Sequence, residues 1–257
     1  MINPWELKVE DRRTSNSLFT FNIFCEGANS EPLYFEWFET PLIKIITHRD
    51  QKSMCKNVNK TLTKCLEDGI LQKKENGKYD FYEEGIEIWC VFDRDKGANG
   101  ISIKEGDVDF NSAMTIAKDS PLKVAWSNDA FDLWILLHLE DVSKNLEQAQ
   151  GRNYYFDRLT TYFKQHSKPN ELLQKTLLHS TFSYEKDMKQ EKKTRQIILP
   201  EILDKTNIAI NRAKSLIELH QNEVDFAKKM PCTTVFQLIE RLLEIGKKEL
   251  PLPFASI

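Results

Sequence analysis

The stretch Ile86-Glu87-Ile88-Trp89-Cys90-Val91-Phe92-Asp93-Arg94-Asp95 decides how this sequence folds. Its first seven residues are mostly apolar, β-branched or aromatic, which predicts a buried strand of an α/β sheet. Residues two apart in a strand point to the same side, so Asp93 and Asp95 present their carboxylates together. Open α/β sheets bind ligands beyond the carboxyl ends of their strands. Paired acids there favour a cation between them, and oxygen ligands suit Mg²⁺ or Mn²⁺.

A second strand end supplies a further acid. The run 20–25 (TFNIFC) predicts another strand, and Glu26-Gly27 follows it directly. Gly27 permits a sharp turn into a helix predicted over 31–40, whose start is marked by Glu31-Pro32. For each acid alone, a charged residue that merely ends a strand explains the pattern equally well. Together, and in this order, the acids favour a common site.

Strand and helix signals alternate through the first half of the chain. Besides the segments above, strands are predicted over 42–46 and 122–126, and helices over 58–71, 108–118 and 129–140. This alternation predicts an α/β fold with a mainly parallel sheet flanked by helices. Beyond residue 144 strand signals fade, and helices are predicted over 154–164, 171–178, 200–221 and 235–248. The expected organisation is a flexible arm over 1–18, an α/β domain over 19–143 and an all-helical region over 144–257.

Polar residues also follow the strand predicted over 122–126. Ser127 and Asn128 lie where they could bind phosphate, but both residue types also cap helices well, and a helix is predicted to follow. Asp132 lies among apolar neighbours, where a carboxylate is costly to bury without a partner. His138 lies in another apolar stretch, where a histidine is more often a hydrogen-bonded core residue than a catalyst.

Four stretches of this sequence, in order, resemble motifs of the RloB family, which includes the AbiLii-type abortive-infection proteins of bacteria. The first contains Glu26, Gly27, Ser30, Glu31, Pro32, Tyr34 and Phe35. The second contains Phe92, Asp93 and Asp95. The third contains Ser127, Asn128, Phe131, Trp134, Leu136, Leu137 and His138, and the fourth is Met230-Pro231-Cys232-Thr233-Thr234-Val235. Two positions depart from the family pattern, because Asp129 replaces a proline and Asp132 replaces a glutamate.

The resemblance implies a fold and a chemistry. A glutamate on one strand end and Asp-x-Asp on another are similar to the Toprim domain, which cleaves nucleic acids in topoisomerases, primases and OLD-type nucleases. By this resemblance Asp93 and Asp95 bind metal, and Glu26 binds metal or acts as a general acid or base. Glu31 and Asp132 are further catalytic candidates. Tyr184 and Lys186 resemble a Y-x-K element of the family, in which Lys186 could stabilise phosphate charge, although a plain surface lysine fits equally well. Ser127, Asn128 and His138 are phosphate-binding candidates.

Composition sets limits on the function. The chain has 257 residues, with 36 Lys and Arg against 39 Asp and Glu, so its net charge of −3 gives no support to nucleic-acid binding. The five cysteines show no C-x-x-C spacing, which argues against structural zinc or disulfides. Neither a membrane-spanning run nor a signal peptide is apparent, so a cytoplasmic protein is expected. A P-loop is also missing, so ATP hydrolysis would require the separate ATPase partner that the resemblance implies.

Three functional hypotheses remain open at this point. The first is a Mg²⁺- or Mn²⁺-dependent endonuclease that cleaves DNA or RNA in anti-phage defence. The second is a non-catalytic effector that binds a partner protein or nucleic acid through its helical half. The third is a phosphohydrolase that acts on nucleotides. The sequence does not decide between DNA and RNA, the number of metal ions, or whether the chain forms a homo-oligomer.

Overall fold

The computed structural model describes residues 18–51, 54–94, 103–142 and 151–250. The strands and helices up to residue 142 are β1 (Phe19–Cys25), α1 (Ser30–Glu36), β2 (Ile43–His48), α2 (Met54–Glu67), β3 (Leu71–Lys73), β4 (Tyr79–Phe81), β5 (Ile86–Asp93), α3 (Ile103–Lys118), β6 (Leu122–Asn128) and α4 (Asp132–Leu139). Those after it are α5 (Arg152–Lys164), α6 (Glu171–Leu177), α7 (Tyr184–Asp187), α8 (Glu191–Lys193), a π-helical turn (Thr194–Ile198), α9 (Leu199–Ile202), a 3₁₀ turn (Leu203–Lys205), α10 (Thr206–Leu219), a second 3₁₀ turn (Phe226–Lys228), β7 (Cys232–Thr233) and α11 (Val235–Gly246).

The main sheet has five strands in the order β2-β1-β5-β6-β7. The first four strands are parallel, and β7 runs antiparallel to β6. This confirms the predicted mainly parallel sheet with flanking helices, followed by a largely helical second half. The strand predicted from the opening stretch, β5, lies at the centre of the sheet and is buried along its middle six residues.

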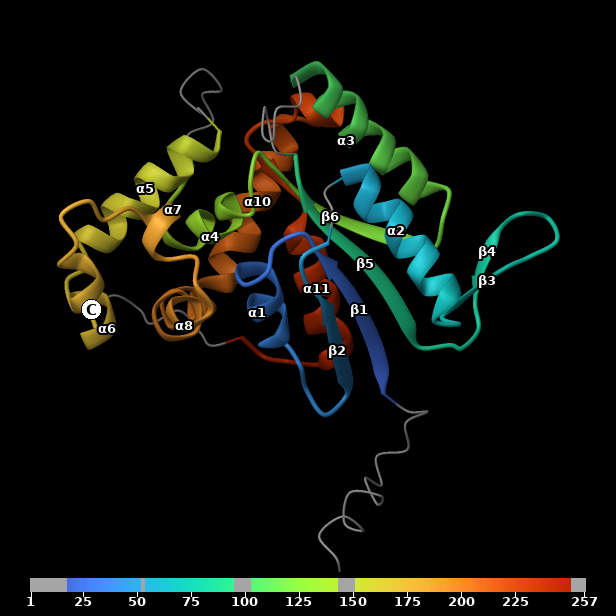
Figure 1. The fold of residues 1–257 in the computed structure, drawn as a ribbon, viewed down its shortest axis with the longest axis horizontal. Coiled ribbons are helices and arrows are strands. Elements are labelled where there is room, and N and C mark those ends of the chain that lie inside the picture. The colour runs from blue at the N-terminus through green and yellow to red at the C-terminus, as the bar shows by residue number, and fades with distance from the viewer. Residues whose placement is uncertain (1–17, 52–53, 95–102, 143–150, 251–257) are drawn as a thin grey trace, which may run out of the picture.

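The two faces of β5 contact different helices. Ile88, Cys90 and Phe92 belong to a core that also contains residues of α2 and α3. Trp89 and Val91 belong to the core on the other face, which contains residues of α1, α4 and α11. Figure 1 shows α2 and α3 along one side of the sheet and α1 and α11 on the other. A strand covered on both faces needs apolar side chains at nearly every position, which is the pattern that the sequence carries.

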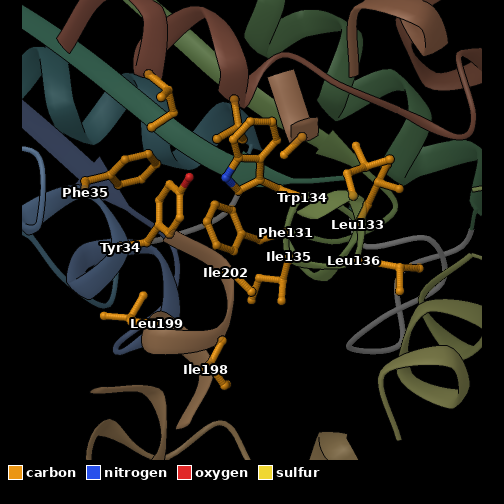
Figure 2. Close-up of a cluster of buried hydrophobic side chains, with 14 of the residues drawn as sticks. Tyr34, Phe35, Phe131, Leu133, Trp134, Ile135, Leu136, Ile198, Leu199 and Ile202 are labelled. Atoms are coloured by element: carbon orange, nitrogen blue, oxygen red, sulfur yellow. The ribbon is translucent and has the colours of Figure 1, made fainter. Parts of the chain in front are cut away.

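The second half packs directly on the first. Figure 2 shows Tyr34 and Phe35 of α1 beside Phe131 and Trp134, with Ile202 of α9 close by. All five side chains belong to one core cluster, which continues through α10 and ends in α11. The helical half therefore contributes side chains to the same hydrophobic core as the sheet.

The structure also contains strands that the sequence patterns did not predict. The antiparallel pair β3 and β4 joins α2 to β5 through a turn in which Gly77 has a φ of 79°, a conformation that glycine adopts without strain. The region expected to be all-helical contains β7, a strand of two residues. The helix predicted over 200–221 is interrupted, because a 3₁₀ turn separates α9 from α10.

Other expectations concern the arm, the cysteines and the membrane. The predicted flexible arm over 1–18 lies outside the described residues apart from Leu18. Cys25, Cys65, Cys90 and Cys232 are buried free thiols, as expected for core cysteines. In the part of the chain that the structure describes, every helix is too short or too polar to cross a membrane.

Candidate functional site

The strand order creates a crevice at one place on the sheet. From β1 the chain passes through α1 to β2 on one side, whereas from β5 it passes through α3 to β6 on the other. Since α1 and α3 cover opposite faces, the chain leaves the carboxyl ends of β1 and β5 in opposite directions. Ligands of open α/β sheets bind at this kind of switch point. Glu26 and Asp93 lie at these two strand ends.

Glu26 is held against the end of β5. Its backbone N–H donates to the carbonyl oxygen of Val91 at 3.0 Å, which extends the pairing of β1 with β5. Its carboxylate Oε2 accepts a hydrogen bond from the backbone N–H of Asp93 at 3.2 Å. The sheet thus brings together two acids that are 67 residues apart in the sequence. Asp95, the third predicted metal ligand, lies outside the described residues.

Glu31 enters the same site from the first turn of α1. Only 4% of its surface is exposed. Its carboxylate lies over Gly27, where an added Cβ would be 1.7 Å from Glu31 Oε2. Burial raises the pKa of Glu31 to about 7. The nearby Lys189 ammonium opposes this rise only in part, and the negative charge of Asp132 adds to it. The burial of Glu31 beside Asp132 therefore favours the protonated carboxyl group over the carboxylate.

Asp132 lies at the start of α4 and is paired with a lysine from the helical half. Its Oδ2 accepts a hydrogen bond from Lys189 Nζ at 2.7 Å. Its Oδ1 is buried without a hydrogen-bond partner among the described residues. The Asp132 side chain is 3% exposed and the Lys189 side chain 38% exposed. The buried Tyr184 hydroxyl lies beside this carboxylate, and burial together with the Asp132 charge raises the pKa of Tyr184.

Lys189 lies just after α7, and contacts of both its main chain and its side chain fix its position. The side-chain amide of Asn29 donates to the Lys189 carbonyl oxygen at 3.1 Å and ties this segment to the turn after β1. The Lys189 ammonium also lies 4.8 Å from the ring centre of Phe156. Burial disfavours the charged ammonium, but Asp132 outweighs this effect and raises the pKa of Lys189. The ammonium is therefore charged at neutral pH.

These side chains line one cavity of about 200 Å³. Four of its lining residues carry carboxyl groups and one carries an ammonium group: Glu26, Glu31, Asp93, Asp132 and Lys189. Acids in excess at a recessed site favour the binding of a cation. Within the described residues, no three His, Cys, Asp or Glu side chains are close enough together to hold a metal ion.

Lys186 does not line the cavity. It lies in α7 and is exposed to solvent, and its backbone N–H donates to the Ser183 hydroxyl at 3.3 Å. Lys189, three residues later, supplies the ammonium group at the site instead. The sequence signal for Lys189 was weak, because it is one of five basic residues within 186–195.

Ser127 and Asn128 have structural contacts rather than a place in the cavity lining. The Ser127 hydroxyl lies 3.0 Å from the Thr233 hydroxyl of β7. The Asn128 side-chain amide donates to the carbonyl oxygens of Ala227 at 3.0 Å and Lys229 at 2.8 Å. Neither side chain caps α4, which has no side-chain cap. Ser127 instead contacts β7, and Asn128 holds the segment before β7 against the end of β6.

His138 lies in the core beneath the site, not on the cavity. It is 1% exposed, with Nδ1 2.8 Å from the Trp134 carbonyl oxygen and Nε2 3.0 Å from the Tyr34 hydroxyl. The carbonyl oxygen can only accept, so Nδ1 carries the proton and Nε2 accepts from Tyr34. Burial lowers the pKa of His138 to about 3, which keeps the ring neutral. These contacts join α1 to α4, the helices that carry Glu31 and Asp132.

Asp129, one of the two departures from the family pattern, is also bound within the protein. It is 3% exposed and its carboxylate accepts hydrogen bonds from Arg152 of α5, at 3.3 Å from both Nε and Nη2. Asp132, the other departure, keeps a carboxylate at the cavity.

Comparison with protein families gives one match. The model of a family described as RloB-like protein matches residues 21–242, a span that includes every described residue of the cavity. Comparison with curated proteins gave no match, and neither did comparison with solved structures.

Proposed function

The chain belongs to the RloB-like family, and we propose that it is a metal-dependent endonuclease that hydrolyses phosphodiester bonds in DNA or RNA. The observation that carries the proposal is the meeting of Glu26 and Asp93 at the switch point of the sheet. A nuclease needs acids there to hold a cation and a basic group to meet phosphate. The cavity contains both, since Lys189 lies within it.

The donor set suits Mg²⁺ or Mn²⁺. Asp93 and Glu26 offer carboxylate oxygens, the ligands that these hard cations prefer. Asp132 adds a further buried carboxylate to the cavity lining, where it pairs with Lys189. Asp93, together with Asp95 and Glu26, would hold the ion. Once bound, such an ion polarises the phosphate and lowers the pKa of a water molecule.

Lys189 and Glu31 would act on the substrate directly. The Lys189 ammonium is a compact cation that can balance the extra charge that develops on the phosphate oxygens during cleavage. It takes the role that the family resemblance gave to Lys186. Glu31, with a pKa of about 7, can hold a proton at neutral pH and pass it to a departing oxygen. Glu26 is the alternative acid or base, as the resemblance to Toprim domains implies.

The biological setting follows from the resemblance to abortive-infection proteins. We infer a cytoplasmic nuclease that acts in anti-phage defence, where cleavage of nucleic acid would stop the infection. An ATPase partner would supply the nucleotide hydrolysis for which this sequence has no P-loop.

The first experiment incubates the purified chain with Mg²⁺ or Mn²⁺ and, separately, duplex DNA, transfer RNA and messenger RNA. Asp93→Asn and Glu26→Gln keep the side-chain size but remove the charge that would hold the cation. We expect each to reduce cleavage by roughly a hundredfold or more. Glu67→Gln, the same change at an exposed position of α2, is the matched control and should cleave like the wild type.

Two results would contradict the proposal. One is the lack of metal-dependent cleavage of all three polymers by the wild-type chain. The other is cleavage that survives Asp93→Asn, because the acids at the strand ends would then be structural. Cleavage of one polymer alone would identify the substrate.

A further inference from the structure

The two edges of the main sheet differ in which outward-facing backbone groups already have hydrogen-bond partners. At the β2 edge, the backbone N–H of Ile45 donates to Glu39 Oε2 at 2.9 Å, and that of Ile43 donates to the Thr40 carbonyl oxygen at 3.3 Å. Local groups therefore satisfy the hydrogen-bonding positions that another strand would need. At Ile43 and Ile45, therefore, the outward N–H groups are not available to another strand.

At the opposite edge of the sheet, β7 covers the carboxyl end of β6. β7 pairs with just Ser127 and Asn128, the last two residues of β6. The next contacts come from Thr234, whose backbone N–H donates to the Trp126 carbonyl oxygen at 2.8 Å and whose hydroxyl accepts from the Trp126 N–H at 3.0 Å. After Thr234 the chain turns into α11 and leaves β6.

Val124 continues this edge beyond the end of β7. Backbone groups two residues apart in a strand face the same neighbour, so the N–H and C=O of Val124 face the same edge as those of Trp126. An extended segment lying antiparallel to β6, in line with β7, would meet both groups. At Leu122 the N–H already donates to the Ser120 hydroxyl at 3.3 Å, so Val124 is the residue at which this edge offers both a donor and an acceptor.

A groove of about 810 Å³ lies along this part of β6. Apolar side chains from several elements line it, including Met114 of α3, Ile217 of α10 and Phe226 of the 3₁₀ turn before β7. Lys118, Lys123 and Lys229 also line it, against a single carboxylate, Asp119. Lys123 pairs with Glu87 at 2.9 Å, and Lys229 lies 4.8 Å from the centre of the Phe226 ring.

We propose that this groove binds an extended segment of a partner protein, which adds to β6 as an antiparallel strand next to Val124. The backbone of the segment would pair with the Val124 N–H and C=O, and its alternate apolar side chains would fill the groove. An acidic residue in the segment would pair with Lys118 or Lys229. A peptide fits better than a nucleic acid, because the open positions are a main-chain donor and acceptor bordered by apolar side chains. The proposal is independent of the nuclease activity, which depends on a different cavity.

The test uses displayed random peptides selected on the wild-type chain, followed by synthesis of the enriched peptide. We expect the enriched sequences to alternate apolar residues and to contain Asp or Glu. The double variant Lys118→Glu/Lys229→Glu should weaken binding about tenfold or more, a loss of about 1.4 kcal/mol. Lys104→Glu, the same change at an exposed position of α3 outside the groove, is the matched control.

The hydrogen bonds of the added strand need their own test. Val124→Pro removes the N–H at the open edge, and proline is tolerated on edge strands when its N–H position faces outward. Binding should be lost in this variant while the thermal unfolding midpoint stays near that of the wild type. If the variant does not fold, peptides N-methylated at successive residues test the same bonds on the wild-type chain. Strand addition predicts that methylation of the residue opposite Val124 abolishes binding, whereas methylation of its two immediate neighbours, whose N–H groups face away from β6, does not.

Several results would overturn the proposal. No enriched peptide, or a peptide that tolerates N-methylation at every residue, would exclude strand addition. Equal loss of binding in Lys104→Glu would indicate a nonspecific charge effect. A dimer seen by light scattering and dissociated by Val124→Pro would mean that a second copy of this chain, not a partner, occupies the groove.

Discussion

At the scale of single residues, Gly27 acts through the side chain it lacks. It does not have the positive φ seen at Gly77, so its backbone conformation does not itself require glycine. Its role is to leave room for the Glu31 carboxylate, which an added Cβ would meet at 1.7 Å. This close approach explains why a small residue directly follows Glu26 at the candidate site.

Gly27→Ala should therefore impair the site without unfolding the protein. We expect cleavage to fall by up to roughly a hundredfold, because a displacement of about 1 Å at a catalytic group can cost that much. The check is a double-mutant cycle of cleavage rates. The double variant Gly27→Ala/Glu31→Ala should cleave only slightly more slowly than Glu31→Ala alone. Fully additive effects would mean that Gly27 acts on something other than Glu31.

A second prediction at this scale concerns His138 and pH. The folded state holds this ring neutral with a pKa of about 3, whereas in the unfolded chain the pKa returns to about 6.5. Between these values the unfolded state binds more protons, so stability falls as pH decreases below about 6.5. His138 contributes at most about 1.4 kcal/mol per pH unit to this fall.

Urea unfolding at several pH values between neutrality and mild acid measures the effect. His138→Leu should be less stable at neutral pH, because the bonds to Tyr34 and Trp134 are lost. Its stability should nevertheless fall less steeply with acid than that of the wild type. Equal slopes for the two proteins would show that His138 does not carry this dependence.

At the scale of elements, one ion pair joins the sheet end to the helical half. Lys189 lies between α7 and α8 and pairs with Asp132 at the start of α4. Its main chain is also bound by Asn29, in the turn between β1 and α1. The candidate site is therefore assembled from elements of both halves, and α7 sets the position of its only lysine among the described lining residues.

Replacing Lys189 by Met should leave Asp132 buried without its partner. We expect a loss of about 1 to 3 kcal/mol in stability, moderated because the ammonium is partly exposed, together with a loss of cleavage. Lys186→Met, three residues earlier on an exposed face, should change neither property by much. Chemical unfolding and cleavage assays on both variants make the comparison. Greater sensitivity of Lys186 would restore the role that the sequence motif assigned to it.

At the scale of the whole molecule, one hydrophobic cluster includes residues from Phe21 of β1 to Leu242 of α11. It contains sheet residues such as Val91 and helical residues of the second half such as Leu238. The helical half therefore stabilises the sheet whose strand ends carry the candidate site. We expect the two halves to unfold together.

Leu238→Ala tests this expectation far from the cavity. The side chain is fully buried, so its truncation should cost about 2 to 5 kcal/mol. All five tryptophans lie within residues 5–134, so their fluorescence reports on the first half, while circular dichroism reports chiefly on the helices. The two signals should shift together to lower urea concentrations. Separate transitions would show that the halves are independent units.

The sequence alone determined the parallel sheet and the acids at its strand ends. Local apolar runs specify β1 and β5, and the residues that follow each run lie at the same edge because parallel strands align their carboxyl ends. The meeting of Glu26 and Asp93 at one edge of the sheet could therefore be inferred from position along the chain. The helices of the second half were also predictable, apart from their exact bounds, because their apolar spacing is local.

Only the tertiary structure decided the features that depend on distant contacts. Asp132 meets Lys189 across 57 residues, and Ser127 meets Thr233 across 106 residues. No local pattern distinguishes Lys189 from Lys186, or marks two residues near 232 as a strand, because both outcomes depend on which surface the helical half packs against. For the same reason, Ser127, Asn128 and His138 were phosphate-binding candidates in the sequence but bind core partners in the fold. Local patterns specify elements and their ends, whereas packing decides which side chains those ends meet.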